Sequence, residues 1–428
     1  MANSTLTILD LEDNSIGDNG AQALSEALKV NSTLTTLVLG GNSIGDNGAQ
    51  ALSEALKINS TLTILDLGDN SIGDNGTQAL SEALKINWTL STLDLSLSSI
   101  RDNGAQALSE ALKTNATLTT LALGSNSIGP NGAHALSEAL KTNSTLTTLD
   151  LGGNSIGDNG TQALSEALKI NSALTTLDLW NNLIGDNGAQ ALSKALKTNS
   201  TLTNLDLRTH TMLVLGSNSI GDNGAQALFE ALKTNSTLTT LDLWGNSIGD
   251  NGAQALSEAL KINSALTTLD LGGNSIGDNG AQALSEALKS NSTLTNFTMG
   301  ASLIQQLEAS NSEQDGKAAN KTAQITILKP SQELLEVYPA IGQTNFFNSE
   351  LPKNHKVFNW NDFHYTEGMV YKPPPIVSSG EANSTMGKRT LRFLNIVRIY
   401  SSHIASKISR MRENLYLDEL GIKHSTTD

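Results

Sequence analysis

Hydrophobic and polar positions recur along this chain with a spacing of 28 residues. The segment from 143 to 170 is representative and reads NSTLTTLDLGGNSIGDNGTQALSEALKI. Equivalent units begin at Asn3, Asn31, Asn59, Asn87, Asn115, Asn143, Asn171, Asn199, Asn235 and Asn263, and a partial unit begins at Asn291. A repeat of this length indicates a stack of similar structural units along one axis, because such units share one continuous core.

The first hydrophobic pattern within the unit has a period of two. In TLDL, Leu149 and Leu151 alternate with Thr148 and Asp150. Alternation of this kind predicts a short strand whose leucines point inward while the threonine and the aspartate face the other way.

The second pattern has helical spacing. Leu164 and Leu168 lie four residues apart, and Asp158 precedes them as the expected N-cap of the helix. Pro130 replaces this aspartate in one unit, where its fixed φ suits the first turn. Between strand and helix, the Asn154 amide is expected to bond the backbone of neighbouring coils, because a buried loop must satisfy its polar groups.

A single unit cannot fold alone. About six aliphatic side chains contribute roughly 1.5–3 kcal/mol each, whereas ordering costs about 1.5 kcal/mol for every residue. The units must therefore stack, with a parallel sheet on one side and helices on the other. Strands stack about 4.8 Å apart and helices need about 8–10 Å, so we expect a curved, horseshoe-like array with the sheet on its concave face.

Residues 3–300 resemble a known family. Leu146, Leu149, Leu151, Asn154 and Ile156 match the pattern L-x-x-L-x-L-x-x-N-x-I. The stretch LTTLDLGGNSIGDNGAQALSEAL is similar to the ribonuclease-inhibitor class of leucine-rich repeat, also found in NOD-like receptors and in Ran GTPase-activating proteins. The resemblance implies an α/β leucine-rich-repeat solenoid that binds proteins through its concave strand residues.

One unit departs from the pattern. It runs from 199 to 234, and two strand-like segments, NSTLTNLDL and RTHTMLVLG, follow each other directly. Only one can enter the sheet, because a parallel connection needs about a dozen residues or more. We predict that Met212 to Leu215 take the core register and that Leu205 to His210 bulge, although the opposite choice is open. A neutral internal deletion and a functional bulge are both open as the origin of the irregularity.

The outward-facing aspartate recurs and forms a candidate binding surface. The aspartates at this position are Asp10, Asp66, Asp94, Asp150, Asp178, Asp206, Asp242 and Asp270, whereas Val38 and Ala122 interrupt the column. Carboxylates spaced about 5 Å apart repel one another and favour a basic partner. The alternative interpretation is that aspartate merely solvates a short strand.

Large side chains occupy the position two residues after the aspartate in three units. They are Trp180, Arg208 and Trp244. Tryptophan and arginine dominate protein interfaces, so these three residues are candidate contacts. The alternative is that each indole ring packs over a neighbouring turn.

Charge and composition limit the classes of partner and the compartment. Residues 301–428 hold 14 Lys/Arg and 13 Asp/Glu, which leaves 13 and 29 in residues 1–300. Such an acidic array argues against nucleic acid. The chain has no cysteine, its first residues do not read as a signal peptide, and no apolar run is long enough to span a membrane. We therefore expect a cytoplasmic protein, and the many N-x-T sequons follow from the repetition.

After residue 300 the repeat ends. We expect a linker with little order over 301–384, a basic amphipathic helix over 385–418 and a tail over 419–428. The helix could pack, associate with another copy, bind a membrane or dock on the acidic array. The uncapped first coil is a second candidate for self-association.

No set of residues predicts catalysis, a metal site or a cofactor. The segment GEANSTMGKRT has the wrong glycine spacing for a phosphate loop. The sequence thus favours a non-catalytic scaffold that binds a protein or peptide, possibly a basic one, on the concave sheet. A GTPase-activating protein of the Ran type and a structural remnant without a specific ligand are the alternatives.

Overall fold

A computed structural model describes residues 4–206 and 218–299, which form one parallel sheet with a helix after nearly every strand. Each strand is three residues long, and neighbours in sequence are neighbours in the sheet. The strands in this part of the chain are β1 (Ile8–Asp10), β2 (Thr36–Val38), β3 (Ile64–Asp66), β4 (Thr92–Asp94), β5 (Thr120–Ala122), β6 (Thr148–Asp150), β7 (Thr176–Asp178), β8 (Asn204–Asp206), β9 (Thr240–Asp242), β10 (Thr268–Asp270) and β11 (Asn296–Thr298).

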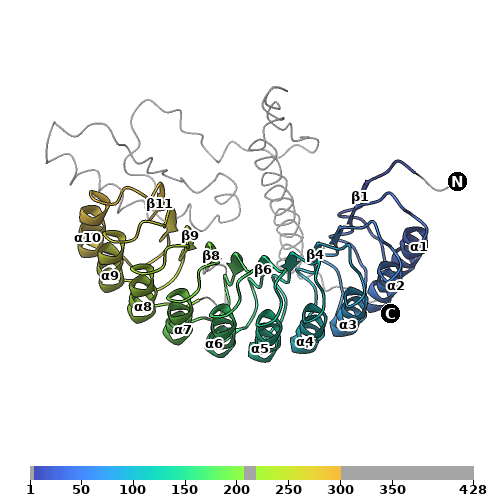
Figure 1. The fold of residues 1–428 in the computed structure, drawn as a ribbon, viewed down its shortest axis with the longest axis horizontal. Coiled ribbons are helices and arrows are strands. Elements are labelled where there is room, and N and C mark those ends of the chain that lie inside the picture. Colours follow the sequence, from blue (N-terminus) through green and yellow to red (C-terminus); the bar gives the residue numbers. More distant parts are fainter. Residues whose placement is uncertain (1–3, 207–217, 300–428) are drawn as a thin grey trace, which may run out of the picture. The chain divides into compact units, whose positions relative to one another are not determined.

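The helices form a second row beside the sheet. Within the repeat array, they lie along the outer side of a curve and the strands along its inner side (Figure 1). They are α1 (Asp18–Leu28), α2 (Asp46–Leu56), α3 (Asp74–Leu84), α4 (Asp102–Leu112), α5 (Pro130–Leu140), α6 (Gly157–Leu168), α7 (Asp186–Leu196), α8 (Asp222–Leu232), α9 (Asp250–Leu260) and α10 (Asp278–Leu288). The predicted α/β repeat solenoid is confirmed.

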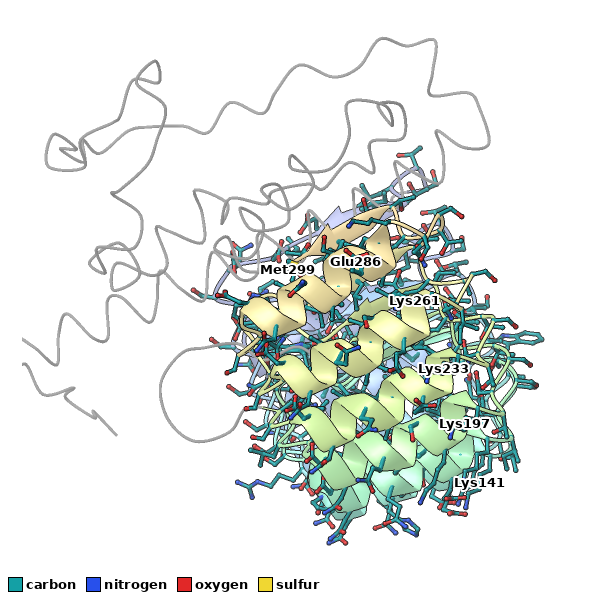
Figure 2. All side chains as sticks on the ribbon, turned by 90° about the vertical axis from the view of Figure 1, so that its left-hand side faces the viewer. Lys141, Lys197, Lys233, Lys261, Glu286 and Met299 are labelled. Atoms are coloured by element: carbon teal, nitrogen blue, oxygen red, sulfur yellow. The ribbon has the colours of Figure 1, made fainter. Side chains whose placement is uncertain are left out.

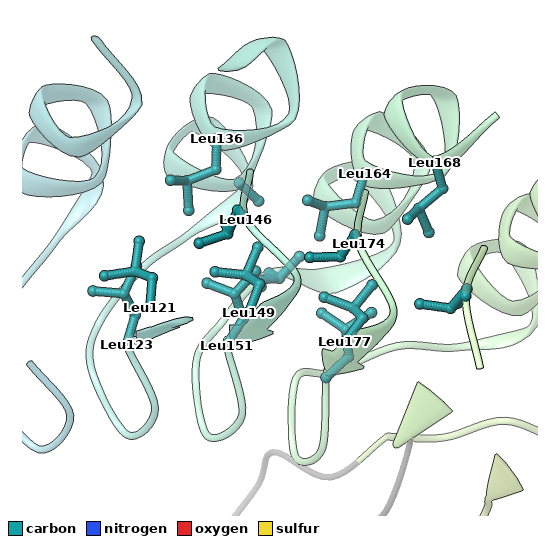
Figure 3. Packing of buried hydrophobic residues seen from close by; sticks show 14 of the residues in the cluster. Leu121, Leu123, Leu136, Leu146, Leu149, Leu151, Leu164, Leu168, Leu174 and Leu177 are labelled. Carbon is teal, nitrogen blue, oxygen red and sulfur yellow. The ribbon is translucent and has the colours of Figure 1, made fainter. Parts of the chain in front are cut away.

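Strand register places the same side chain of each unit side by side. Thr148 pairs with Thr176 and Leu149 pairs with Leu177. Leu149 and Leu151 are buried, whereas Thr148 is half-buried on the other face. Leucines from the strands meet those from the helices in one core that runs through the array (Figure 3). The predicted inward direction of the leucines is therefore confirmed.

A buried or half-buried asparagine after most of the described strands joins consecutive coils, as predicted, although Ser98 takes its place after β4. The Asn154 amide donates to the carbonyls of Leu123 and Leu151 at 3.0 and 2.9 Å, and its Oδ1 accepts the Ile128 N–H at 2.9 Å. One side chain thereby satisfies backbone groups in two coils, which supports a turn that water cannot reach.

A second asparagine ladder, which the sequence analysis missed, runs under the helix C-termini. Asn143 Nδ2 donates to the carbonyl of Leu112, the last residue of α4, at 2.8 Å. Its Oδ1 accepts the backbone N–H of Leu146, also at 2.8 Å. Asn143 is also the acceptor position of an N-x-T sequon, so the nitrogen that a glycan would modify is buried and bonded in the folded array.

The expected role of Asp158 as the cap of its own helix is wrong. No side chain caps α6, and Asp158 is the second residue of that helix. Its Oδ1 instead accepts the N–H groups of Gly185 and Gly188, at 2.8 and 2.9 Å, at the start of α7. Glycine is required there, because a Cβ on Gly188 would lie 2.7 Å from that Oδ1. Each such carboxylate therefore stabilises the N-terminus of the next helix.

Pro130 fits the first turn of α5, as expected. It has no carboxylate, however, so this coil lacks the acceptor that an aspartate here provides for the start of the next helix. The N–H of Gly157 turns to the Asn182 carbonyl at 2.8 Å, with Gly157 at φ +60°. The N–H of Gly160 donates to the carbonyl of Ile156, four residues earlier in the same coil, at 3.2 Å. The start of α6 is consequently one residue longer than in the other described helices.

The prediction for the irregular unit is wrong. Leu205, which we expected to bulge, occupies the sheet and pairs with Leu177 and Leu241. The segment from Met212 to Leu215 lies outside the described residues. The reason is the threonine ladder: Thr203 Oγ1 donates to Thr175 O, and Thr239 Oγ1 donates to Thr203 O, each at 3.1 Å. The first segment follows Asn199 at the normal distance and keeps these bonds.

The regular pattern resumes at Asn218, whose Nδ2 donates to Leu179 O at 2.9 Å across 39 residues, compared with 31 in a regular coil. The unit thus keeps its first strand and gains eight residues between Asp206 and Asn218, and residues 207–217 lie outside the described part. In the helix that follows, Phe229 is fully buried where other units carry serine.

The predicted linker, basic helix and tail over 301–428 also lie outside the described residues. Those assignments stay predictions.

Candidate functional site

Basic side chains in the described part of the chain lie on the helix side of the array, whereas acidic side chains lie on both sides. In the described residues, every lysine lies at a helix C-cap except Lys194, which lies within α7. Figure 2 shows Lys141, Lys197, Lys233 and Lys261 along one edge of the helix row. The strands contain aspartates and neither lysine nor arginine.

Carboxylates on the helix side form ion pairs with these lysines. Lys57 contacts Glu54 at 2.6 Å and Lys85 contacts Glu82 at 2.7 Å, each three residues apart on one helix. The hydrogen bond from Lys57 lowers the pKa of Glu54, and the hydrogen bond from Lys85 lowers the pKa of Glu82, because each favours the charged carboxylate. The helix-side glutamates are therefore mostly paired with lysines, whereas the aspartates at the helix starts accept backbone N–H groups.

The strand-side aspartates have a structural role that the sequence analysis did not identify. Asp178 Oδ1 accepts the N–H of Trp180 at 2.9 Å, and Asp242 Oδ1 accepts the N–H of Trp244 at 3.0 Å. Asp150 bonds the residue two positions later in the same way, at 2.8 Å. Such bonds close the turn after each strand. Aspartate therefore shapes the turn and also brings a negative charge to the sheet face.

Asp270 repeats this turn at 2.8 Å with Gly272. In β8, Asp206 lies in register with Asp178 and Asp242, so the sheet places the aspartates of β7, β8 and β9 side by side. The carboxylates of β6, β7, β9 and β10 are half-buried at the sheet face. Arg208 lies outside the described residues.

The two tryptophan rings contact neighbouring turns. A Cβ built on Gly152 would lie 1.9 Å from Trp180 Nε1, and one on Gly272 would lie 2.5 Å from Trp244 Cδ1. Both side chains are half-buried. Trp180 covers the preceding coil and Trp244 the following coil, so the rings point away from the irregular unit between them. Ring packing is thus one role of these residues, and the remaining surface of each ring is accessible.

Within residues 4–206 and 218–299, no cluster of side chains could hold a metal ion. The helices of this same part include none that is long and apolar enough to cross a bilayer.

Comparison with protein families identifies the architecture. The sequence profile described as "Leucine Rich repeat" matches ten segments, at residues 2–25, 30–53, 59–81, 87–109, 114–137, 142–165, 171–193, 211–229, 234–257 and 263–285. These segments cover more than half of the chain. The chain belongs to the leucine-rich repeat family. Its repeats are of the ribonuclease-inhibitor-like class, as the resemblance implied.

The profile and the structure treat the irregular unit differently. The eighth match begins at residue 211, within the second strand-like segment, and therefore uses that segment as the strand of the unit. In the structure β8 is formed by the first segment. The hydrogen-bonded register decides for the first, because β8 pairs with both neighbours.

Solved structures with similar chains include other repeat proteins. The leiomodin-1 actin-binding site 2 shares 25% identity, with 38% of this chain and 88% of that chain covered and a TM-score of 0.31. The tropomodulin C-terminal domain of Caenorhabditis elegans shares 16% identity over 33% and 86%, with a TM-score of 0.30. An internalin from Listeria monocytogenes shares 22% identity over 69% and 86%, with a TM-score of 0.30. No curated protein matches the chain.

Proposed function

We propose that this leucine-rich repeat protein is a binding scaffold whose sheet face, from β6 to β10, takes a basic protein or peptide. Leucine-rich repeat proteins typically bind protein partners. The more specific assignment of face and charge rests on one observation: the strands carry aspartates and no basic residue. Electrostatic complementarity at such a face would favour lysine- and arginine-rich partners.

The spacing of the carboxylates supports an extended contact. Strands lie about 4.8 Å apart, so successive aspartates form a row of similar charges along the array. A row of this kind matches a chain or helix that presents several basic groups at once. Each added contact would raise the association rate and strengthen the salt dependence of binding.

Trp180 and Trp244 would supply apolar contact area within this acidic face. Their rings are fixed against Gly152 and Gly272, so little side-chain entropy is lost when a partner covers them. Rigid aromatic anchors beside polar groups are typical of interface hot spots.

The test separates charge from structure. Asparagine keeps the Oδ1 acceptor that closes the turn but removes the charge, so the triple variant Asp178→Asn, Asp242→Asn, Asp270→Asn should keep its fold. We expect its affinity for a lysine-rich 20-residue probe peptide to fall about tenfold at low salt, with an unchanged Tm. Fluorescence anisotropy with labelled peptide measures the affinity.

A matched control removes the same number of charges from the helix side. The variant Glu166→Gln, Glu258→Gln, Glu286→Gln should change peptide affinity less than twofold, because these carboxylates lie across the array from the sheet. Equal losses in the two triple variants would mean that net charge alone attracts the peptide, and the assignment of the sheet face would fail.

A further inference from the structure

Exposed apolar side chains cluster at one edge of the array, away from the sheet face. Val30, Ile58 and Ile86 follow the C-caps of α1, α2 and α3, and are 74%, 63% and 62% exposed. Trp88 lies two residues after Ile86 and is 75% exposed. We call these four residues the apolar rim. Contiguous exposed apolar groups on a folded surface indicate an interaction site.

The rest of the described array lacks this continuity. At the same unit position the other coils carry Thr114, Thr142, Ile170, Thr198, Thr234, Ile262 and Ser290. Ile170 and Ile262 are each 62% exposed, but polar residues occupy the coils on both sides of them. The tryptophan is likewise specific to one coil, because most units carry serine at its position.

The backbone under the rim is fixed. The N–H of Ile58 donates to Ala55 O at 3.0 Å and that of Ile86 donates to Ala83 O at 3.1 Å. Asn59 Nδ2 donates to Leu28 O at 2.8 Å, and Asn87 Nδ2 donates to Leu56 O at the same distance. The asparagine ladder therefore holds the three helix ends together and presents the apolar side chains at regular coil spacing, as a preorganised surface.

Each helix under the rim carries a Glu–Lys ion pair near its C-terminus, as most of the described helices do, in a chain of formal charge −15. Lys29 contacts Glu26 at 2.7 Å, and the equivalent pairs follow on α2 and α3. Most faces of this acidic array would repel a second copy. Along the helix C-termini paired charges reduce that repulsion, and at the rim this edge also carries continuous apolar side chains, so rows of Glu and Lys on two copies can complement each other around them.

We propose that two copies of this chain associate through their apolar rims about a two-fold axis. An antiparallel arrangement would place the rim of one copy on that of the other, with Ile58 near the axis. Trp88, the largest side chain, would then cover Val30 of the second copy, whose coil has only Ser32 at the tryptophan position. Large and small ends thus match, which favours close packing.

The rim can sustain a weak dimer. Four exposed side chains of this size present roughly 500 Å² in each copy, so the contact would bury about 1,000 Å² in total, the low end of specific interfaces. We expect a weak dimer with a Kd on the order of 10 μM, because contacts of this small size are typical of transient association.

The chain itself supplies fold-neutral substitutions for the test. Ile58→Thr and Ile86→Thr introduce the residue of the fourth and fifth units, and Trp88→Ser introduces that of most units. In sedimentation equilibrium from about 1 to 200 μM, the full chain should dimerise, and the triple variant should lose at least about 100-fold in affinity. The control Ile170→Thr, Ile262→Thr should retain the dimer, and circular dichroism should match for all three proteins.

Several outcomes would overturn the proposal. A wild-type chain that stays monomeric at 200 μM has no such dimer, and a dimer that survives the triple substitution uses another surface. Trp88 emission, read in a variant with Trp180, Trp244 and Trp360 changed to Phe, should shift to shorter wavelength only as concentration rises. A shift that is independent of concentration would mean that another segment of the same chain covers the rim. Binding of the monomer to anionic vesicles would instead assign the rim to a lipid surface.

Discussion

The two sides of the repeat array carry similar carboxylates in different settings. On the helix side each glutamate usually has a lysine three residues later and forms an ion pair with it, as Glu54 does with Lys57. On the sheet side Asp150 and its equivalents hold the turn N–H through Oδ1, and no strand in the described part of the chain contributes a lysine. The comparison teaches that net charge alone does not locate a binding face. What matters is where the repeat places its counter-charges.

The largest effect is expected in the interior that both sides share. Asn154→Ala removes bonds to Leu123 O, Leu151 O and Ile128 N, and leaves buried backbone groups without partners. We expect the free energy of unfolding to fall by about 2–4 kcal/mol in urea denaturation. The exposed neighbour Ser155 provides the control, and Ser155→Ala should change stability by less than about 0.5 kcal/mol. Equal effects would mean that the ladder does not join the coils.

A smaller effect is expected on the sheet side. Asp150→Ala loses the bond to Gly152 N and should cost about 1 kcal/mol, whereas Asp150→Asn keeps that acceptor and should be nearly neutral. Thermal unfolding of the two variants checks the difference. If alanine and asparagine behave alike, the turn bond contributes nothing and the aspartates act through charge only.

At the helix starts, one substitution should stabilise the array. Pro130→Asp would restore the carboxylate that the other described coils use for the following helix, with Gly157 and Gly160 N–H as its donors. The expected gain is about 0.5–1 kcal/mol, seen as a higher urea midpoint. Pro130→Asn keeps an oxygen acceptor without the charge and separates hydrogen bonding from the dipole effect. A loss of stability with both variants would show that α6 has adapted to proline.

The smallest effect concerns a helix-side ion pair. The hydrogen bond from Lys141 lowers the pKa of Glu138 below its ordinary value of 4.5. A depressed folded-state pKa gives stability that is present above the unfolded value and is lost as pH falls through the folded one. Side-chain NMR titration should place Glu138 below 4.5 and return it toward that value in Lys141→Met. If the Glu138 titration is the same in Lys141→Met, the ion pair does not lower the pKa of Glu138.

The regular coils could be predicted from sequence because one pattern determines them repeatedly. Leu149 and Leu151 alternate with polar residues, and Asn154 follows at a fixed distance, so strand, core side and interior hydrogen bonds were all predicted. The structural role of the asparagine that begins each unit, such as Asn143, was not predicted, because the repetition explained its sequon without any structural function. This asparagine bonds to the preceding coil, as Asn143 does to Leu112. The pattern within one unit does not show which backbone groups of the preceding unit lie nearby.

The errors have the same physical origin. Asp158 was assigned to its own helix, whereas its carboxylate reaches the next coil at Gly185. In the irregular unit, Leu205 keeps the sheet because Thr203 bonds both adjacent coils, a constraint between units that local hydrophobicity does not reveal. For the candidate site, the aspartate column and both tryptophans were predicted, but their contacts with the turns depend on stacking. Their role in binding stays a prediction.

The most direct test of the proposed sheet-face scaffold is to find which carboxylates touch a basic partner. Zero-length carbodiimide cross-linking of a lysine-rich peptide to the full chain, followed by mass spectrometry, reports those contacts residue by residue. The account predicts adducts on Asp178, Asp242 and Asp270, and few on helix-side carboxylates such as Glu258. Adducts concentrated on the helix-side glutamates, with the strand aspartates unmodified, would contradict it.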